Sequence, residues 1–288
     1  MSDMNRLDSK ARIQVISALL EGCSIRSTVR MTGVSKKTVM RLLVEAGSVA
    51  ASYQDQIFRN LNCKRLELDE LWAFIAAKQK DATPEMAAKN PAAGDVWLWV
   101  ALDADTKLVP CWALGNRDLR TACDFVDDLA GRLKNRVQIT TDGHRPYVEA
   151  IERAFAGFVD YSILQKIYGK PGENETRYSP AQCVGIEERR VCGNPDPRHV
   201  STSYVERQNL SVRMSLRRYT RLTNAFSRKL ENHEAAVALY YFSYNLIKIH
   251  GSLRMSQAMA AGVTDRLFEI SDLVALLEAE ERKGKRAA

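Results

Sequence analysis

Residues 64–76 read KRLELDELWAFIA, and this stretch decides the fold class. It opens with alternating basic and apolar residues, which is the period of a strand with one solvent-exposed side. Within it, Asp69 stands among apolar positions, where a carboxylate is costly to bury unless it binds something. We therefore predict a strand that carries a functional acid.

The rest of the chain alternates strand and helix patterns. Apolar runs predict strands at residues 96–103, 108–114, 137–141 and 159–167, and helical spacing predicts helices at 119–133, 147–155, 203–223, 231–249 and 270–283. This order predicts an α/β fold with a mixed sheet and helices on both faces. Residues 81–94 are predicted to be a loop, and residues 169–200, rich in Pro and Gly, an inserted loop or β-flap.

The first fifty residues predict an all-α unit. Three helices are expected within residues 8–46, the third over 36–45, with a tight Thr-Gly-Val-Ser turn at 32–35 before it. Basic residues lead the third helix, which favours a helix-turn-helix over a plain three-helix packing unit. The side chains expected to face outward there are Lys36, Lys37, Thr38 and Arg41. Residues 47–62 are predicted to be a polar connector.

Positive charge is concentrated in two segments. The whole chain has a net charge of +7 and a pI near 9.1, which is too little to identify a partner. Residues 189–229 hold ten basic side chains against two acidic ones, and residues 1–50 hold eight against four. Arginine outnumbers lysine nine to one in residues 189–229. This composition favours recognition of phosphate or carboxylate over an ordinary solvent-exposed basic face.

Composition excludes several classes of protein. The apolar fraction of 45% excludes wholesale disorder, and no apolar run approaches the ~18 residues of a transmembrane helix. The six cysteines form no C-x-x-C pair and only four histidines are present, so no structural zinc site is expected. Residues 1–12 lack an apolar signal core. We therefore expect a cytoplasmic protein with no membrane partner.

Three carboxylates stand at the ends or within the predicted elements. Asp69 lies in the first strand, Asp142 directly follows the strand at 137–141, and Glu206 lies one turn into the arginine-rich helix. Open α/β sheets place ligands at the carboxyl ends of their strands, although a helix start also favours an acid for structural reasons. Three carboxylates without His or Cys ligands suit Mg²⁺ or Mn²⁺, and two such ions would catalyse phosphodiester chemistry.

A longer match supports this chemistry. Residues 201–229, STSYVERQNLSVRMSLRRYTRLTNAFSRK, resemble the glutamate helix of bacterial insertion-sequence transposases of the IS1 family. The segments DELW at 69–72 and TDGH at 141–144 resemble the first two acids of the same Asp-Asp-Glu (DDE) catalytic set. The run YNLIKIHGSLR at 244–254 is similar to the sequence that follows that helix in the family.

The resemblance implies a domain plan and an activity. It implies a helix-turn-helix domain at residues 1–50, a linker at 51–63, an RNase H-like catalytic domain at 64–250 with an insertion at 169–200, and a helical tail at 251–288. It also implies a transposase that binds the ends of its element, cleaves them and joins the 3′ ends to target DNA. Its partners would be double-stranded DNA and further copies of the same chain, at the nucleoid of a bacterial cytoplasm.

Site roles follow from the same resemblance. Asp69, Asp142 and Glu206 would hold two Mg²⁺ or Mn²⁺ ions, with His144 and Arg207 beside them. Besides the first turns of the third helix, DNA contacts are expected from Asn209, Arg213, Arg217, Arg218 and Arg221; Asn209 and Arg213 share the helical face of Glu206. Two alternatives remain open: an RNase H-like nuclease that cuts without joining, and a helix-turn-helix regulator whose acids are vestigial.

Overall fold

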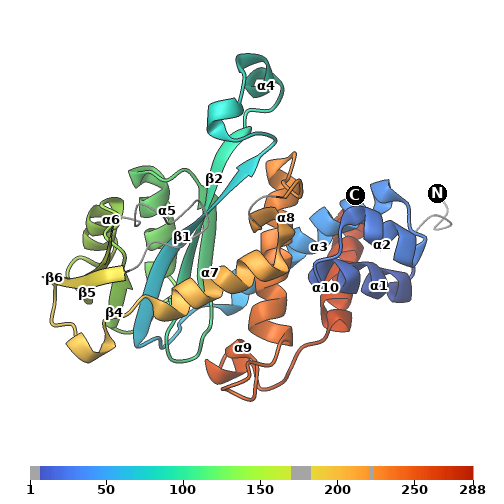
Figure 1. Cartoon of the computed structure of the whole chain (residues 1–288). Helices are drawn as coiled ribbons and strands as arrows, with labels where there is room; N and C mark the ends of the chain where they lie inside the picture. The colour runs from blue at the N-terminus through green and yellow to red at the C-terminus, as the bar shows by residue number, and fades with distance from the viewer. Residues whose placement is uncertain (1–6, 170–182, 221–222, 288) are drawn as a thin grey trace. The chain divides into compact units, whose positions relative to one another are not determined.

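The computed structural model describes residues 7–169, 183–220 and 223–287 (Figure 1). Contacts between Cα atoms divide the chain into two compact units. One comprises Met1–Arg59, Leu71–Leu98 and Gln208–Ala288, and the other comprises Asn60–Glu70 and Trp99–Arg207. In this division the N-terminal and C-terminal helices belong to the same unit.

The strands form one six-stranded sheet (Figure 1). Its strands are β1 (Arg65–Ile75), β2 (Gly94–Asp103), β3 (Cys111–Gly115), β4 (Val137–Thr141), β5 (Val159–Tyr168) and β6 (Cys183–Cys192), in the order β3-β2-β1-β4-β5-β6. The pairs β1–β4 and β4–β5 are parallel, whereas β5–β6 is antiparallel. The predicted α/β class and mixed sheet are therefore confirmed.

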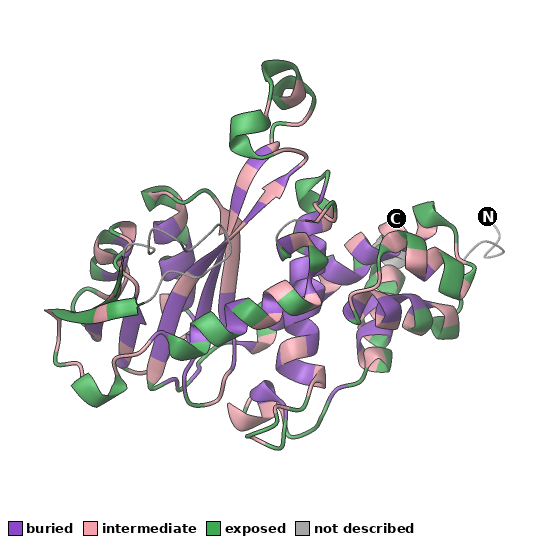
Figure 2. Ribbon diagram, in the orientation of Figure 1, coloured by how far each residue is buried: buried purple, intermediate pink, exposed green. Residues whose placement is uncertain are grey.

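The predicted insertion at 169–200 contributes a strand to this sheet. Residues 183–192 of it form β6, which is exposed along most of its length (Figure 2), and η2 (Pro197–His199) follows. Residues 170–182 of the insertion lie outside the described residues. The described second half of this segment is therefore a β-strand. It pairs antiparallel with β5, from Tyr161 opposite Cys192 to Tyr168 opposite Cys183.

Alternation along β1 gives the strand two different faces. Glu70 contacts Arg117, which precedes α5 (Leu119–Ala130), so Glu70 points to the side of the sheet that faces α5. Side chains alternate along a strand, so Leu66 and Leu68 point to the same side as Glu70, and both are buried there. On this side Trp99 of β2 packs against Phe125 of α5 and Tyr147 of α6 (Pro146–Phe155), with ring centroids 6.0 and 5.3 Å apart. The opposite face carries Glu67 and Asp69.

The N-terminal helices form where the sequence predicts them. They are α1 (Ser9–Leu20), α2 (Ile25–Thr32) and α3 (Lys36–Ile57), with N-cap hydrogen bonds from Asp8, Ser24 and Ser35. Gly33 ends α2 with a φ of 70°, a left-handed conformation that glycine adopts without strain. The turn at 32–35 is therefore built as predicted, with Ser35 starting α3.

The predicted end of the third helix is wrong. Residues 47–62 were expected to be a connector, but α3 continues to Ile57. The sequence prediction ended the helix at Gly47, but this glycine lies inside α3, where α3 packs against α8 (Leu230–Phe242). A Cβ atom at this position would stand 2.5 Å from the Cα of Ala235. This glycine allows two helices to approach closely instead of ending one.

Three further boundaries differ from prediction. The arginine-rich helix ends earlier than residue 223: α7 (Ser203–Ser215) is followed by an extended Leu216 and by η3 (Arg217–Tyr219), where the Thr220 hydroxyl donates to the carbonyl of Arg213 at 2.8 Å. The loop predicted at 81–94 contains α4 (Pro84–Lys89), capped by Thr83, after η1 (Gln79–Asp81). The helix predicted at 231–249 is α8, which continues as a π-helical turn, η4 (Ser243–Ile247).

The C-terminal helices pack within the helical unit. After α9 (Gln257–Ala260), α10 (Ile270–Ala287) packs on both α1 and α3. Arg12 of α1 forms an ion pair with Glu281 at 3.1 Å, and Ser9 donates to Glu278 at 2.6 Å. Among the described residues, the helices lack any segment with the length and apolarity needed to cross a bilayer.

A buried imidazole holds the segment after α7 in place. His233 of α8 is 0% exposed, and its ring nitrogens lie 2.8 Å from the Tyr219 hydroxyl and 3.2 Å from the Ser227 hydroxyl. Burial, with a smaller effect from the charge of Arg218, lowers the pKa of His233 from 6.5 to about 3. The ring is therefore neutral in the folded protein.

This imidazole makes stability depend on pH. Below the ordinary histidine pKa of 6.5, the unfolded chain binds a proton that folded His233 does not accept. We expect the free energy of unfolding to fall between about pH 6.5 and about pH 4, by up to ~1.4 kcal/mol per pH unit from this group. Urea titrations at several pH values give the free energy of unfolding as a function of pH. This free energy should depend less on pH in His233→Gln, whereas His199→Gln, at an exposed position, should keep the wild-type pH dependence. The same pH dependence in all three proteins would contradict the assignment.

Candidate metal centre

The pairing of β1 with β4 brings two of the predicted acids together. Leu68 of β1 pairs with Thr141 of β4 in a parallel register, so the next residue on each strand is an aspartate, Asp69 and Asp142. Both line an open cleft of about 880 Å³ that Glu206 of α7 also lines. The structure therefore gathers the three predicted acids, which come from separate parts of the chain, around one cleft.

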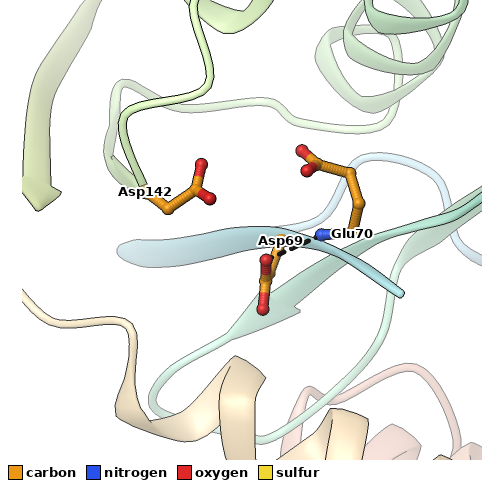
Figure 3. Close-up of side chains that lie close together, drawn as sticks. All are labelled: Asp69, Glu70 and Asp142. Atoms are coloured by element: carbon orange, nitrogen blue, oxygen red, sulfur yellow. Dashed lines mark hydrogen bonds between the residues drawn. The ribbon is translucent and has the colours of Figure 1, made fainter. Parts of the chain in front are cut away.

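One close acidic cluster in the described part of the chain contains a residue that the sequence did not single out. Carboxylate oxygens of Asp69, Glu70 and Asp142 lie within 4.8 Å of one another, so this trio could hold a metal ion. Figure 3 shows the Glu70 and Asp142 carboxylates on one side of β1 and the Asp69 carboxylate directed to the other. Three hard oxygen donors fit Mg²⁺ or Mn²⁺. The only feature of the sequence that points to Glu70 is its position next to Asp69, as the second acid of the DELW segment at 69–72.

Arg117 bridges two members of this trio. Its Nε donates to Glu70 at 3.1 Å, and its Nη2 lies 3.8 Å from Asp142. Glu70 is buried, and burial together with the charges of Asp142 and Asp69 raises its pKa to about 7, while the charge of Arg117 acts in the opposite direction. Arg117 therefore reduces the repulsion between two carboxylates held close together. Nothing in the sequence pattern marked this arginine.

Glu206 faces the same cleft but is already paired. The Nζ atom of Lys166 on β5 lies 2.5 Å from both of its carboxylate oxygens, and the Thr202 hydroxyl donates to Oε1 at 2.7 Å. Glu206 is absent from the close trio. It therefore belongs to the cleft without belonging to the preassembled cluster.

A buried acid fixes the start of α7 on β1. The backbone N–H groups of Tyr204 and Val205 donate to Glu67 Oε2 at 2.8 and 2.9 Å, and Glu67 is 3% exposed. These are orphan donors of the first helical turn, which a carboxylate satisfies well. Glu67 stands two residues before Asp69 and its partner Tyr204 two residues before Glu206. The interaction therefore sets the spacing between two acids of the cleft.

His144 supports the turn that carries Asp142. Its backbone N–H donates to Asp142 Oδ1 at 2.9 Å, and its ring lies 5.7 Å from Trp99 and 6.0 Å from Tyr147. Burial, helped by the charge of Arg117, lowers the pKa of His144. Its imidazole lines the cleft as a partly buried ring. Arg207, which follows Glu206 directly, is exposed.

The predicted DNA contacts after Glu206 differ in accessibility. Asn209 is buried, at 7% exposed, and Arg213 is half-buried, with Nη1 donating to the Tyr219 carbonyl at 3.3 Å. Arg218 is also half-buried and donates to Ser227. Arg217 is exposed to solvent, and Arg221 lies outside the described residues.

The predicted contacts at the start of α3 lie at the surface. Lys36, Lys37 and Arg41 are exposed, and Arg41 makes an i,i+4 ion pair with Glu45 at 3.7 Å. Thr38 is half-buried, and its backbone N–H donates to the Ser35 hydroxyl. Three of the four predicted side chains are therefore offered to solvent on the first turns of this helix.

Comparison with known proteins assigns no family to the chain. No family model matches it, and no curated protein matches it.

The Glu67 contact predicts a local effect on α7. Replacing Glu67 by Ala leaves two helix-start N–H groups without their acceptor, which should lower the free energy of unfolding by about 1–3 kcal/mol. Hydrogen exchange should be faster at the Tyr204 and Val205 amides. Glu67→Gln keeps an acceptor oxygen and should show a smaller effect. Unchanged protection of both amides in Glu67→Ala would contradict this role.

The acidic trio predicts metal affinity. Glu70→Gln and Asp142→Asn should each weaken Mn²⁺ binding at least about tenfold, because each removes one of three anionic ligands. Calorimetric titration of the full chain measures this directly. Asp124→Asn, on the exposed side of α5, removes the same charge outside the cleft and should bind Mn²⁺ like the wild type. Equal affinities in all four proteins would show that the trio is not the site.

Proposed function

We propose that this protein is a DDE transposase that cuts and joins DNA with divalent metal ions. The observation that carries the proposal is the cleft itself: Asp69, Asp142 and Glu206, the three acids expected from the resemblance to IS1-family transposases, line it together. The strand order is consistent with an RNase H-like fold. Oxygen-only ligands support Mg²⁺ or Mn²⁺ as the cofactor, with two ions per site.

The groups that line the cleft, and the buried acids Glu67 and Glu70 beside it, each have a task in this reaction. Asp69, Glu70 and Asp142 would hold a metal ion, which when bound supplies activation of a water or 3′-hydroxyl and stabilises the leaving oxygen. Arg117 provides positive charge beside carboxylates that would otherwise repel a phosphodiester. Glu67 holds the first turn of α7 so that Glu206 faces the cleft.

The helical unit would recognise the DNA. Exposed Lys36, Lys37 and Arg41 follow a tight turn at the start of α3, where a helix-turn-helix presents its recognition helix to the major groove. We propose that this surface binds the ends of the element. Because two ends must be joined in one complex, the active species is a homo-oligomer on DNA, in the cytoplasm of a bacterium.

The decisive experiment is a strand-cleavage and joining assay. The full chain is incubated with Mg²⁺ or Mn²⁺ and a plasmid carrying the DNA that flanks its gene. Wild type should cleave at the element ends and join 3′ ends, and Asp142→Asn and Glu206→Gln should lose about 100-fold or more of the cleavage rate. The Asp124→Asn control should retain it.

The products separate the proposal from its alternatives. Free ends without joined strands would indicate a nuclease. Specific DNA binding without any metal-dependent cleavage would indicate a regulator. Full strand transfer by Asp142→Asn would overturn the assignment of the cleft.

DNA binding should depend steeply on salt. Each Lys or Arg that contacts a phosphate releases counterions, so Lys36→Ala and Lys37→Ala should each weaken binding and lower the slope of log affinity against log salt by about 1. Fluorescence anisotropy with labelled duplex gives both quantities. Lys80→Ala, an exposed lysine in η1, should leave the slope unchanged. A slope insensitive to Lys36 and Lys37 would exclude this surface as the phosphate contact.

A further inference from the structure

The acids of the cleft differ in readiness for a cation. Asp69, Glu70 and Asp142 already place oxygens within 4.8 Å of one another. Glu206 lines the same cleft, yet both of its oxygens lie 2.5 Å from Lys166 Nζ, and one also accepts from Thr202. A divalent ion at the trio meets Arg117, which contacts Glu70 and Asp142, but leaves the Lys166–Glu206 pair intact. It can use Glu206 only by displacing the ammonium group of Lys166.

Lys166 is suited to such an exchange. It lies on β5, opposite Ile186 of β6 in the ladder, so its backbone is fixed while its side chain is only partly buried, at 27% exposed. A lysine ammonium is a point charge on a flexible stem, without the rigid two-pronged geometry of arginine, and exposed pairs of this kind are weak. The interaction therefore holds Glu206 in the absence of metal and still yields to a dication.

We propose that Lys166 is a resident counter-ion that competes with divalent metal for Glu206, so that two ions bind in unequal steps. This inference rests on the proposed function. The first ion binds at the preassembled trio. The second binds where Glu206 contributes, and its affinity is lowered by Lys166. The released ammonium stays in the cleft, where it meets the incoming phosphodiester and partly balances its charge.

Titration of the full chain with Mn²⁺ alone tests this without any reaction. Calorimetry, with free Mn²⁺ followed by electron paramagnetic resonance, should resolve a tighter and a weaker site in the wild type. Lys166→Met should tighten the weaker site by about three- to tenfold and leave the tighter one unchanged. Lys134→Met makes the same charge change at an exposed residue before β4, at the opposite end of that strand from Asp142, and should alter neither site.

A double-variant cycle localises the effect to the pair. Glu206→Gln should remove the weaker Mn²⁺ site. Adding Lys166→Met to Glu206→Gln should not restore Mn²⁺ binding at that site, because the carboxylate for which Lys166 competes is no longer present. A weaker site unaffected by Lys166→Met, or shifted equally by Lys134→Met, would overturn the inference while leaving the metal centre standing. A wild type that binds no Mn²⁺ would overturn the inference and the proposed function together.

Discussion

The parallel pairing of β1 with β4 is the constraint on which the cleft depends. Backbone hydrogen bonds set Leu68 opposite Thr141, and the following residues, Asp69 and Asp142, inherit that alignment. A slip of one residue would turn every side chain of β1 to the other face, because strand side chains alternate with a period of two. It would bury Asp69 among the aromatic rings of α5 and α6 and carry Leu68 into the cleft. The apolar core that Leu66 and Leu68 help to form therefore also specifies the position of the acids.

Gathering carboxylates creates a repulsion that the surrounding residues reduce. Arg117 lies against Glu70 and Asp142, Lys166 holds Glu206, and the first amides of α7 bind Glu67. These partners come from three different parts of the fold, and no two of them act on the same acid. The cleft is therefore a set of separately compensated charges, which explains how a folded chain can keep several carboxylates together before any cation or DNA arrives.

The sequence predicted the acids that a local pattern marks and missed those defined by packing. Asp69 stands out as an acid among apolar strand positions, and Asp142 and Glu206 lie just past the end of a strand and near the start of a helix. Glu70 and Glu67 were not singled out, because the partners that define their roles, Arg117 and the first amides of α7, come from distant parts of the chain. Gly47 shows the same limit in the fold: it resembles a helix terminator until Ala235, almost two hundred residues later, is placed against it.

The packing of α10 has a consequence for the order of events during synthesis. In α1, Arg12 and Ser9 pair with Glu281 and Glu278 of α10. Residues 9 and 12 must therefore wait for residues 278 and 281 before these contacts can form. Contacts between residues so far apart in sequence form late in folding, because a long loop must close to make them. Helix α1 therefore reaches its final packing only after residues 278–281 have been synthesised, well after the residues that line the cleft.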